Sequence, residues 1–575
     1  EMCIRDRDMI LWTLALPVFA FVAYKVFRRV QLSRAKHPSL AGHARISRRL
    51  ASQVPKVSYG LDRAFSIDDA PADIVARRHS GMSCLSRQLQ DRSIMSKEIS
   101  SQLTQSVSDM QLTEAYRVPF QFRELVQNRL PINVFASSSD GVQIQSIDGD
   151  WSFDLSGAYG VNLLGYDFYR QCIERGNERA REMGPVLGPY HPVVAENVQF
   201  LQQASGLDEV SFHMSGTEAV MQAVRLARYH TRKSKLVMFS GAYHGWWDGV
   251  QPGVGNRRRS KDILMLAEMS EATLTVLRTR HDIACVIVNP IQVMHPNSSP
   301  ASDASLIGGS TSINIDQQAY IRWLNKLRDI CTSNGIALIF DEVFVGFRLG
   351  LQGAQGSFGV QADLVTYGKT VGGGLPVGVV CGKAIYMKRF REDRPTDLCV
   401  ARGTFNSHPY VMTAMNEFLR FAFSAEFAAI SENAENLWNE RAAELNRQLT
   451  TGGYPLRVSN LASVWTFVYL TPSRYNWMYQ YYLRAEGITL GMVGTGRIIF
   501  SHNFSQADFA EVLRRILAAA KRMQDDGWWW CPADATNKSV RRDVLREFIK
   551  ARLKRRATPH GEDMPEAEGS ASALS

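Results

Sequence analysis

Four short apolar runs, each followed closely by a polar or reactive side chain, restrict the fold of this 575-residue chain more than any other feature. The runs lie at residues 236–239, 284–288, 336–340 and 364–367, and each has the length of a buried strand. Between residues 116 and 523 such runs alternate with helical patterns, which is typical of an α/β domain. Because the carboxyl ends of parallel strands line one crevice, we expect the residues that follow these runs to lie close together.

The residues after the four runs suit a site for pyridoxal phosphate. Tyr243 and His244 follow the first run, Gln292 the second, Asp341 the third and Lys369 the fourth. Pyridoxal phosphate acts as an electron sink, and proteins hold it through a lysine and tune it with a carboxylate at the ring nitrogen. We therefore expect Lys369 to bond the cofactor covalently and Asp341 to keep its ring nitrogen protonated. Tyr243 is placed to stack on the flat ring.

A phosphate-binding turn is predicted at residues 215–217. Ser215, Gly216 and Thr217 precede a helical pattern at 218–229, and Ser215 is a natural helix cap. The free N–H groups of a first helical turn, together with the helix dipole, favour a phosphate. Each of these motifs is common by itself, so the prediction depends on their order and spacing taken together.

Taken together, these motifs resemble those of the class III aminotransferases of fold type I, and more closely those of the branch around glutamate semialdehyde aminomutase. The matching stretches are MSGTEAVMQAVRLAR (214–228), GAYHGWWD (241–248), NPIQ (289–292), DEVFVGFRLG (341–350) and FGVQADLVTYGKTVGGGLPVGVVCGK (358–383). The segment GTFNSHP (403–409) is similar to the version of this branch found in polyketide and peptide synthetases. The resemblance extends from about residue 116 to residue 523.

The resemblance implies a fold and a set of roles. It implies an aminotransferase domain over residues 113–525. Its large domain, about 165–420, carries a seven-stranded, mostly parallel sheet, and a small α+β domain comes from the flanks. The implied roles are Lys369 as the Schiff-base lysine, Asp341 at the ring nitrogen, Val343 and Tyr243 on the two ring faces, His244 beside the ring, Gln292 near the ring hydroxyl, and Gly216 and Thr217 on the phosphate. Thr404 is expected to reach the phosphate of a neighbouring subunit, which implies a homodimer with active sites at the interface.

Two departures from the family pattern affect the expected substrate. Most relatives carry Glu-Pro where this chain has Asn289-Pro290. The small-domain stretch 458–467 offers no obvious arginine to bind a substrate carboxylate. Both departures weaken a direct transfer of the glutamate semialdehyde substrate to this chain.

Three functions stay open at this point. The first is a transaminase that moves an amino group from a donor to a ketone or aldehyde by a ping-pong mechanism. The second is an isomerase of the glutamate-1-semialdehyde 2,1-aminomutase type. The third is a non-catalytic, membrane-tethered scaffold, and the joint presence of Lys369, Asp341 and the phosphate turn argues against it. The donor and the acceptor are not identified.

The N-terminal region is expected to lie outside the catalytic fold. Residues 1–8, beginning EMCIRDR, look like translated sequencing adaptor. Sixteen uncharged residues at 9–24, followed by Lys25 and two arginines, predict a membrane anchor over residues 9–27 with a cytoplasmic catalytic domain. A helix left over from a lost domain is the alternative. Residues 28–112 are polar and weakly periodic, and we interpret them as a basic linker.

The charge and the cysteine content limit the kinds of partner that we expect this chain to bind. The net charge is +10, and residues 25–50 hold eight Lys or Arg and no acid, which favours a membrane surface over nucleic acid. The eight cysteines are scattered without metal-ligand spacing, so we expect reduced thiols and no metal site. Residues 526–556 predict a basic amphipathic helix that packs on the small domain or else binds anionic lipid or an acidic carrier. Together with the missing arginine in residues 458–467, the second alternative predicts a lipid-like or carrier-tethered acceptor. Residues 557–575 are expected to be disordered.

Overall fold

The centre of the structure is a seven-stranded sheet with the strand order β4-β10-β9-β8-β7-β5-β6. The computed structural model describes residues 2–131, 134–258, 261–298, 316–491 and 497–557, and it describes only the backbone of 2–16, 41, 128 and 554–557. The strands are β4 (Glu209–His213), β5 (Lys235–Phe239), β6 (Ile263–Leu266), β7 (Ile283–Val288), β8 (Ala337–Asp341), β9 (Leu364–Gly368) and β10 (Gly378–Gly382). Only β10 runs antiparallel to its neighbours in this sheet, so the predicted mostly parallel sheet is confirmed.

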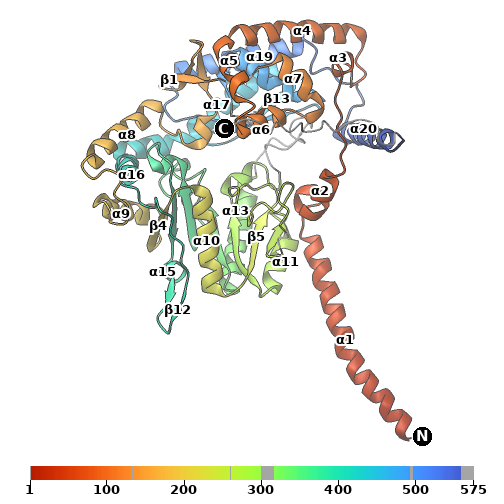
Figure 1. Cartoon of the computed structure of the whole chain (residues 1–575), viewed down its shortest axis with the longest axis vertical. Helices are drawn as coiled ribbons and strands as arrows, with labels where there is room; N and C mark the ends of the chain where they lie inside the picture. The colour runs from red at the N-terminus through yellow and green to blue at the C-terminus, as the bar shows by residue number, and fades with distance from the viewer. Residues whose placement is uncertain (1, 132–133, 259–260, 299–315, 492–496, 558–575) are drawn as a thin grey trace, which may run out of the picture.

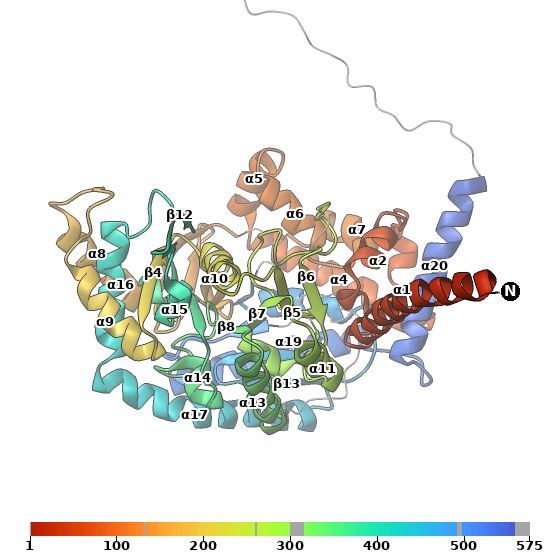
Figure 2. The same ribbon diagram turned by 90° about the horizontal axis from the view of Figure 1, so that it is seen from below.

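Helices cover both faces of this sheet, which is why its central strands are mostly apolar. Every residue of β7, β8 and β9 is buried. Val286 and Val288 belong to a core with α11 and α13, whereas Cys285 and Ile287 belong to a core with α10 on the opposite face. Figure 2 shows α10 on one side of the sheet and α11 and α13 on the other. The helices of this domain are α8 (Tyr166–Ala180), α9 (Val193–Ser205), α10 (Gly216–Thr231), α11 (Glu271–Thr279), α13 (Gln317–Ser333), α14 (Gly353–Phe358), α15 (Ala384–Met387) and α16 (Pro409–Ala422).

A second domain is built from both flanks of the large domain. Its strands β13 (Leu456–Leu461), β14 (Val464–Tyr469) and β16 (Arg497–Ile499) form an antiparallel sheet. A further sheet joins β1 (Ala136–Asp140), β2 (Gln143–Ser146) and β3 (Trp151–Asp154) to β15 (Ile488–Thr489), and so ties residues before the large domain to residues after it. The accompanying helices are α17 (Ala425–Thr451), α18 (Tyr479–Ala485) and α19 (Gln506–Asp525).

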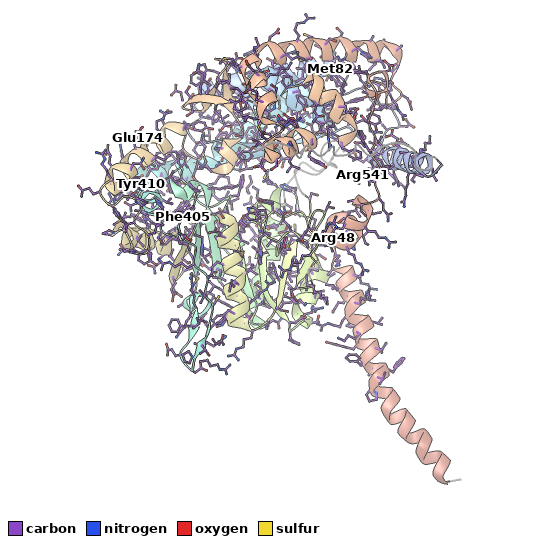
Figure 3. All side chains as sticks on the ribbon, viewed as in Figure 1. Arg48, Met82, Glu174, Phe405, Tyr410 and Arg541 are labelled. Carbon is purple, nitrogen blue, oxygen red and sulfur yellow. The ribbon has the colours of Figure 1, made fainter. Side chains whose placement is uncertain are left out.

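Residues expected to form a linker contribute instead to the core of the small domain. The helices of this region are α2 (Ala44–Ala51), α3 (Leu61–Ala64), α4 (Ala72–Asp91), α5 (Ile94–Leu103), α6 (Ser108–Tyr116) and α7 (Arg123–Arg129). Met82 and Leu85 of α4 are fully buried in the same core as Trp528. Figure 3 labels Met82 on this helix. Arg78, also buried, forms two 2.7 Å hydrogen bonds to Asp68. The linker interpretation is therefore wrong for α4. The helical period of this segment is hard to see in the sequence because Arg, Gly and Ser occupy several of its buried positions.

The N-terminal helix α1 (Met2–Arg34) contacts the large domain only near its end and otherwise projects from the body (Figure 1). Arg28 Nη1 donates to Thr279 O at 2.6 Å, and Ala267 N donates to the carbonyl oxygen of the buried Ala35 at 2.8 Å. Among the residues whose side chains are described, no helix has the length and apolar character needed to cross a membrane. The side chains of residues 9–16 lie outside that description, and the predicted anchor over residues 9–27 finds no support in this fold.

The C-terminal helix α20 (Asn537–Ala557) docks on the N-terminal helical region through its middle turn. Glu547 pairs with Arg474 at 3.1 Å and accepts a hydrogen bond from Tyr59. Phe548 stacks on Phe120 with ring centroids 5.6 Å apart. These contacts agree with the packing alternative for residues 526–556, although Ile549 stays exposed. The predicted disordered tail lies, beyond its first residue, outside the described residues.

A first prediction tests the role of α4. Leu85→Ala should lower the free energy of unfolding by about 2–5 kcal/mol, because it removes a fully buried side chain from the second core. Leu112→Ala, at a leucine that is 59% exposed on α6, should change it by less than about 0.5 kcal/mol. Urea unfolding followed by tryptophan fluorescence measures both. Equal, small effects would show that α4 is not part of a core.

Candidate active site

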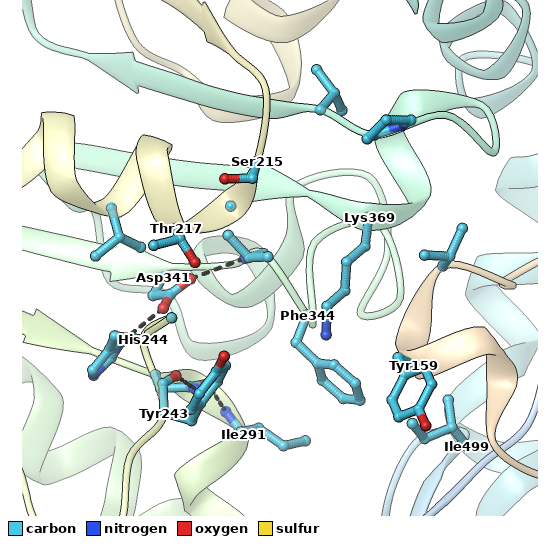
Figure 4. Close-up of a pocket in the computed structure, with 18 of the residues that line it drawn as sticks. Tyr159, Ser215, Thr217, Tyr243, His244, Ile291, Asp341, Phe344, Lys369 and Ile499 are labelled. Carbon is cyan, nitrogen blue, oxygen red and sulfur yellow. Dashed lines mark hydrogen bonds and ion pairs between the residues drawn. The ribbon is translucent and has the colours of Figure 1, made fainter. Parts of the chain in front are cut away.

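The predicted site residues meet at a cavity of about 720 Å³ beside the C-terminal ends of β8 and β9 and the start of α10 (Figure 4). Eight of the ten line it: Ser215, Gly216, Thr217, Tyr243, His244, Asp341, Val343 and Lys369. They come from four separate segments: three follow the apolar runs that end at residues 239, 340 and 367, and the fourth is the start of α10. Their roles toward a cofactor stay predictions at this stage.

Asp341 is held in a fixed orientation at the end of β8. It is 4% exposed, and its Oδ2 lies 2.7 Å from Nδ1 of the buried His244. Its Oδ1 accepts hydrogen bonds from Val343 N and Thr366 Oγ1, each at 3.2 Å. A buried carboxylate is costly unless its oxygens are paired, and here both are. The His244 Nε2 atom is buried, and no described residue forms a hydrogen bond with it.

Lys369 extends into the cavity from a strained backbone position just after β9. Its φ of 52° is in the left-handed region, which is uncommon for a residue other than glycine and typical of functional sites. Nζ lies 4.4 Å from the centroid of the Phe344 ring. Burial, helped by the charges of Arg497 and Arg348, lowers the pKa of Lys369 to about 7, against the opposing charge of Asp341. A large part of this amine is therefore neutral at physiological pH.

The start of α10 forms a close-fitting turn at the cavity. Ser215 Oγ caps the helix by accepting from Glu218 N at 3.3 Å. A Cβ added at Gly216 would lie 2.6 Å from Val343 Cγ1, so only glycine fits there. A Cβ at Gly378 would lie 2.0 Å from Ser215 O, which explains a glycine in the strand that packs behind the turn. The N-terminus of a 16-residue helix, facing a cavity, suits a phosphate group.

The donor set in this cavity fits pyridoxal phosphate. One enclosed space offers an amine with a depressed pKa, a fixed carboxylate, an anion-binding helix terminus and the flat ring of Tyr243. Among the described residues, no group of His, Cys, Asp and Glu side chains could hold a metal ion, so the site has no competing metal assignment there.

Two predicted residues do not line this cavity. Gln292 is 2% exposed on a short 3-10 helix (Pro290–Met294), and Asn289 lines the cavity instead. Asn289 Nδ2 donates to Tyr243 O at 2.9 Å, so this side chain positions the backbone of the stacking tyrosine. Thr404 is exposed and does not line the cavity of its own chain, and its role on a neighbouring subunit stays a prediction.

Arg497 of β16 is the cavity residue that sequence reasoning missed. Its guanidinium lies 5.4 Å from the Phe344 ring, and its Nη2 lies 3.3 Å from His295 Nε2. Burial lowers the pKa of Arg497 to about 10, so the group stays cationic at neutral pH. Burial and Arg497 lower the pKa of His295 to about 3, so this imidazole is neutral. Among the residues that the structure describes, which leave out 492–496, the buried Arg497 Nε has no hydrogen-bond partner.

The expectation that the small domain provides no arginine is therefore corrected. The stretch 458–467 on β13 and β14 does not provide one to the cavity, but the third strand of the same sheet does. Two features of the sequence indicate Arg497: a glycine-containing segment precedes it, and the apolar run 498–500 directly follows it. Tyr159 and Phe344, which also line the cavity, carried no signal of comparable strength.

Comparisons with known proteins agree with this geometry. Residues 126–519 match the family model described as aminotransferase class-III. A glutamate-1-semialdehyde 2,1-aminomutase of Natronomonas pharaonis is 33% identical over 337 residues, 56% of this chain and 68% of that protein. An omega-transaminase from Sphaerobacter thermophilus superposes with a TM-score of 0.58 at 24% identity, over 69% of this chain and 92% of that one. A glutamate-1-semialdehyde aminomutase from Pseudomonas aeruginosa gives 0.62 at 16% identity, over 79% and 99%. The two structural similarities show the fold alone.

A second prediction concerns the Lys369 amine. In protein freed of cofactor, acylation of Lys369 by an amine-selective reagent should rise with pH around a midpoint near 7, because only the neutral amine reacts. Arg497→Met should move this midpoint upward, since it removes a nearby positive charge. Peptide mass spectrometry measures the label, with the exposed Lys538 as reference. A Lys369 midpoint equal to that of Lys538 would contradict the depressed pKa.

Proposed function

The chain belongs to the class III aminotransferases, a family of pyridoxal-phosphate enzymes, and we propose that it moves an amino group from a donor amine to a ketone or aldehyde in two half-reactions. The observation that carries this proposal is one cavity that combines the Lys369 amine, the His244–Asp341 pair and the helix terminus of α10. When bound there, pyridoxal phosphate supplies an electron sink for the carbanion formed at the substrate carbon.

We propose the following division of work among the residues of the cavity. Lys369 bonds the cofactor, and Asp341, oriented by His244, supplies negative charge at the ring nitrogen. Tyr243 and Val343 cover the ring faces, and Ser215, Gly216 and Thr217 bind the phosphate. The cavity lining and the fixed Asp341 carboxylate support these roles. Gln292 is not included, because its side chain does not line the cavity.

Lys369 also suits the proton transfer that transamination requires. An amine displaced by the substrate must take a proton from carbon and return it to another carbon. A pKa near 7 is favourable for both steps at neutral pH, since the group is neither a strong acid nor a strong base there. The nearby aromatic ring of Phe344 can accommodate the ammonium form of Nζ after it takes up the proton.

Arg497 supports a substrate that carries an acidic group near the reacting amine. Arg497 lines the cavity and stays charged, and its buried Nε has no partner among the described residues. Guanidinium groups bind carboxylates in a planar, two-point geometry. A lipid-like or carrier-tethered acceptor was inferred in part from the lack of such a group. That inference has therefore lost part of its support, and an amino acid donor is the better proposal.

An aminomutase is the second candidate, because a relative of that name is 33% identical to this chain. The two functions differ in whether the intermediate leaves the site. In a single turnover with a simple amino donor, a transaminase releases a keto product in an amount equal to the enzyme, whereas a mutase retains it. Substitution of Asn289 by Glu, the usual family residue, would show whether this position influences the outcome.

We further propose a homodimer in which Thr404 contacts the cofactor phosphate of the other subunit. Class III aminotransferases are generally dimers, and Thr404 is exposed beside the exposed apolar side chains of Val400 and Phe405. Such a group of apolar side chains on one loop is typical of an interface. Figure 3 places Phe405 and Tyr410 on the same side of the molecule.

A third prediction tests the covalent attachment. Borohydride treatment of the cofactor-loaded protein should fix pyridoxal phosphate on Lys369, because this lysine lines the cavity. Lys369→Ala should still bind the cofactor, but only non-covalently, and should lose transamination. Peptide mass spectrometry of the reduced protein gives the position of the adduct. Lys383 pairs with Asp363 at 2.7 Å and does not line the cavity. An adduct on Lys383 would overturn the assignment.

A fourth prediction compares two neighbouring carboxyl groups. Asp341→Asn should reduce turnover ~10³-fold with the cofactor still bound, because it removes the negative charge that pairs with the protonated ring nitrogen. Glu342→Gln should leave turnover within a few-fold, because burial raises the pKa of Glu342 to about 8 and the amide resembles its protonated form. Steady-state kinetics with matched cofactor occupancy measures both. Near-normal turnover in Asp341→Asn would show that another acid does this work.

A further inference from the structure

Helix α20 has two faces of different character. Its inner face packs on the body of the protein through Glu547 and Phe548. Its outer face leaves three large apolar side chains in water: Leu545, Ile549 and Leu553 are 57%, 50% and 61% exposed. Because these residues follow one another at intervals of four, they lie in one row along the helix.

Cations border this apolar row on both sides. On a helix with 3.6 residues per turn, Arg541 and Arg552 lie on one side of the row, and Arg546 and Lys550 lie on the other. All four side chains are exposed, and only Arg546 forms an ion pair with a described residue, Asp543 at 3.1 Å. An apolar row between cations is typical of helices that lie in the surface of an anionic membrane, where long cationic side chains reach the headgroups.

The neighbouring helix α2 repeats this arrangement on a smaller scale. Ile46 and Leu50 are one turn apart and both exposed, and Arg49 beside them is exposed as well. Arg48, on the opposite side of the helix, fixes α2 to the large domain by donating to Asn256 O at 2.7 Å. Like α20, this helix is therefore held by one face and presents an apolar and basic face to water.

The two helices adjoin on one side of the molecule. Arg552 Nη1 donates to Oε1 of Gln53, two residues after the end of α2, at 3.2 Å. Figures 1 and 2 both place α2 beside α20, and Figure 3 shows Arg48 and Arg541 on the same side of the body. We call the two exposed faces together the α2–α20 surface.

We propose that the α2–α20 surface binds a membrane surface that contains anionic phospholipids. The apolar rows of the two helices enter the outer edge of the acyl region, and the cations beside them contact the lipid headgroups. This is attachment along the membrane surface and requires no spanning helix. It is independent of the proposed transamination.

The apolar rows favour a bilayer over other anionic partners. Nucleic acid phosphates are bound by cations alone, so they give no reason for three exposed apolar side chains in a row. A helix of an acidic protein binds in an apolar groove. The α2–α20 surface instead presents rows on the convex sides of two helices, and such rows match the boundary between lipid and water.

Vesicle binding by the full, cofactor-loaded chain tests the proposal. Vesicles of phosphatidylcholine alone are compared with vesicles that contain about one phosphatidylserine for every two phosphatidylcholine molecules, at about 0.15 M salt. Flotation should show at least ~10-fold tighter binding to the anionic vesicles, and this binding should weaken as salt rises. Equal binding to the two kinds of vesicle would overturn the proposal.

A double variant, Ile549→Gln with Leu553→Gln, tests the apolar row. Glutamine is a good helix former and removes the apolar surface, so binding to the anionic vesicles should fall at least ~10-fold. Ile94→Gln with Leu112→Gln is the matched control, because these two side chains are also exposed, on α5 and α6. The control should bind as the unsubstituted chain does. No loss in the first variant, or an equal loss in both, would overturn the proposal.

A second double variant, Arg541→Gln with Lys550→Gln, tests the cations. Binding to the anionic vesicles should fall at least ~10-fold and depend less on salt. Lys97→Gln with Arg181→Gln, at exposed cations of other helices, should bind as the unsubstituted chain does. Turnover of a soluble donor should be unchanged in every variant, since none of these residues lines the cavity, and it serves as the measure of correct folding. Equal losses in the two charge variants would overturn the assignment to this surface.

Two other occupants of the surface would give different results. The C-terminal segment 558–575 carries four acids, Glu562, Asp563, Glu566 and Glu568. Vesicle binding that occurs only after these four are replaced by Gln or Asn in the full chain would overturn the proposal in favour of the chain's own tail. A full chain that binds polyglutamate but not the anionic vesicles would overturn it in favour of an acidic protein.

Discussion

The site depends on one buried carboxylate that is held at the end of the central strand β8. Asp341 is enclosed on all sides, and its two oxygens are paired with the His244 ring, a backbone N–H and the Thr366 hydroxyl. These contacts fix the orientation of the carboxylate in the buried site. Lys369, directly after β9, and the start of α10 line the same cavity. A mobile or neutral group at position 341 could not define one orientation for a cofactor.

The position of the substrate-binding side depends on how the two domains meet. Arg348, seven residues after Asp341, is buried and donates to Ser463 Oγ at 2.8 Å and to Phe500 O at 2.7 Å. Both acceptors belong to the small domain, and Phe500 lies directly after the strand that carries Arg497. The segment that provides Asp341 therefore also joins the large domain to the small-domain strand that carries Arg497. Because Arg348 also lowers the pKa of Lys369, this junction influences chemistry as well as geometry.

The sequence predicted the parts of the site that local patterns encode, and missed the parts that tertiary packing creates. Strands β5, β7, β8 and β9 were predictable because buried parallel strands are continuous apolar runs, and Asp341 and Lys369 directly follow two of them. Arg497 was missed because it reaches the cavity across a domain junction from a strand far away in the chain. Helix α4 was missed because polar residues such as Arg78 and Ser86 occupy its buried face and find partners only in the folded state. Gln292 follows a strand as predicted, yet the next turn directs Asn289 to the cavity instead.

The central claim is that the Asp341–His244 pair keeps the ring nitrogen of the bound cofactor protonated. Nitrogen NMR of the protein loaded with pyridoxal phosphate labelled with ¹⁵N in the ring measures this proton directly. The account predicts the chemical shift of a protonated ring nitrogen at neutral pH, and predicts that it persists at mildly alkaline pH, because the buried carboxylate stabilises the positive charge. An unprotonated ring nitrogen in the folded, loaded protein at neutral pH would contradict the account.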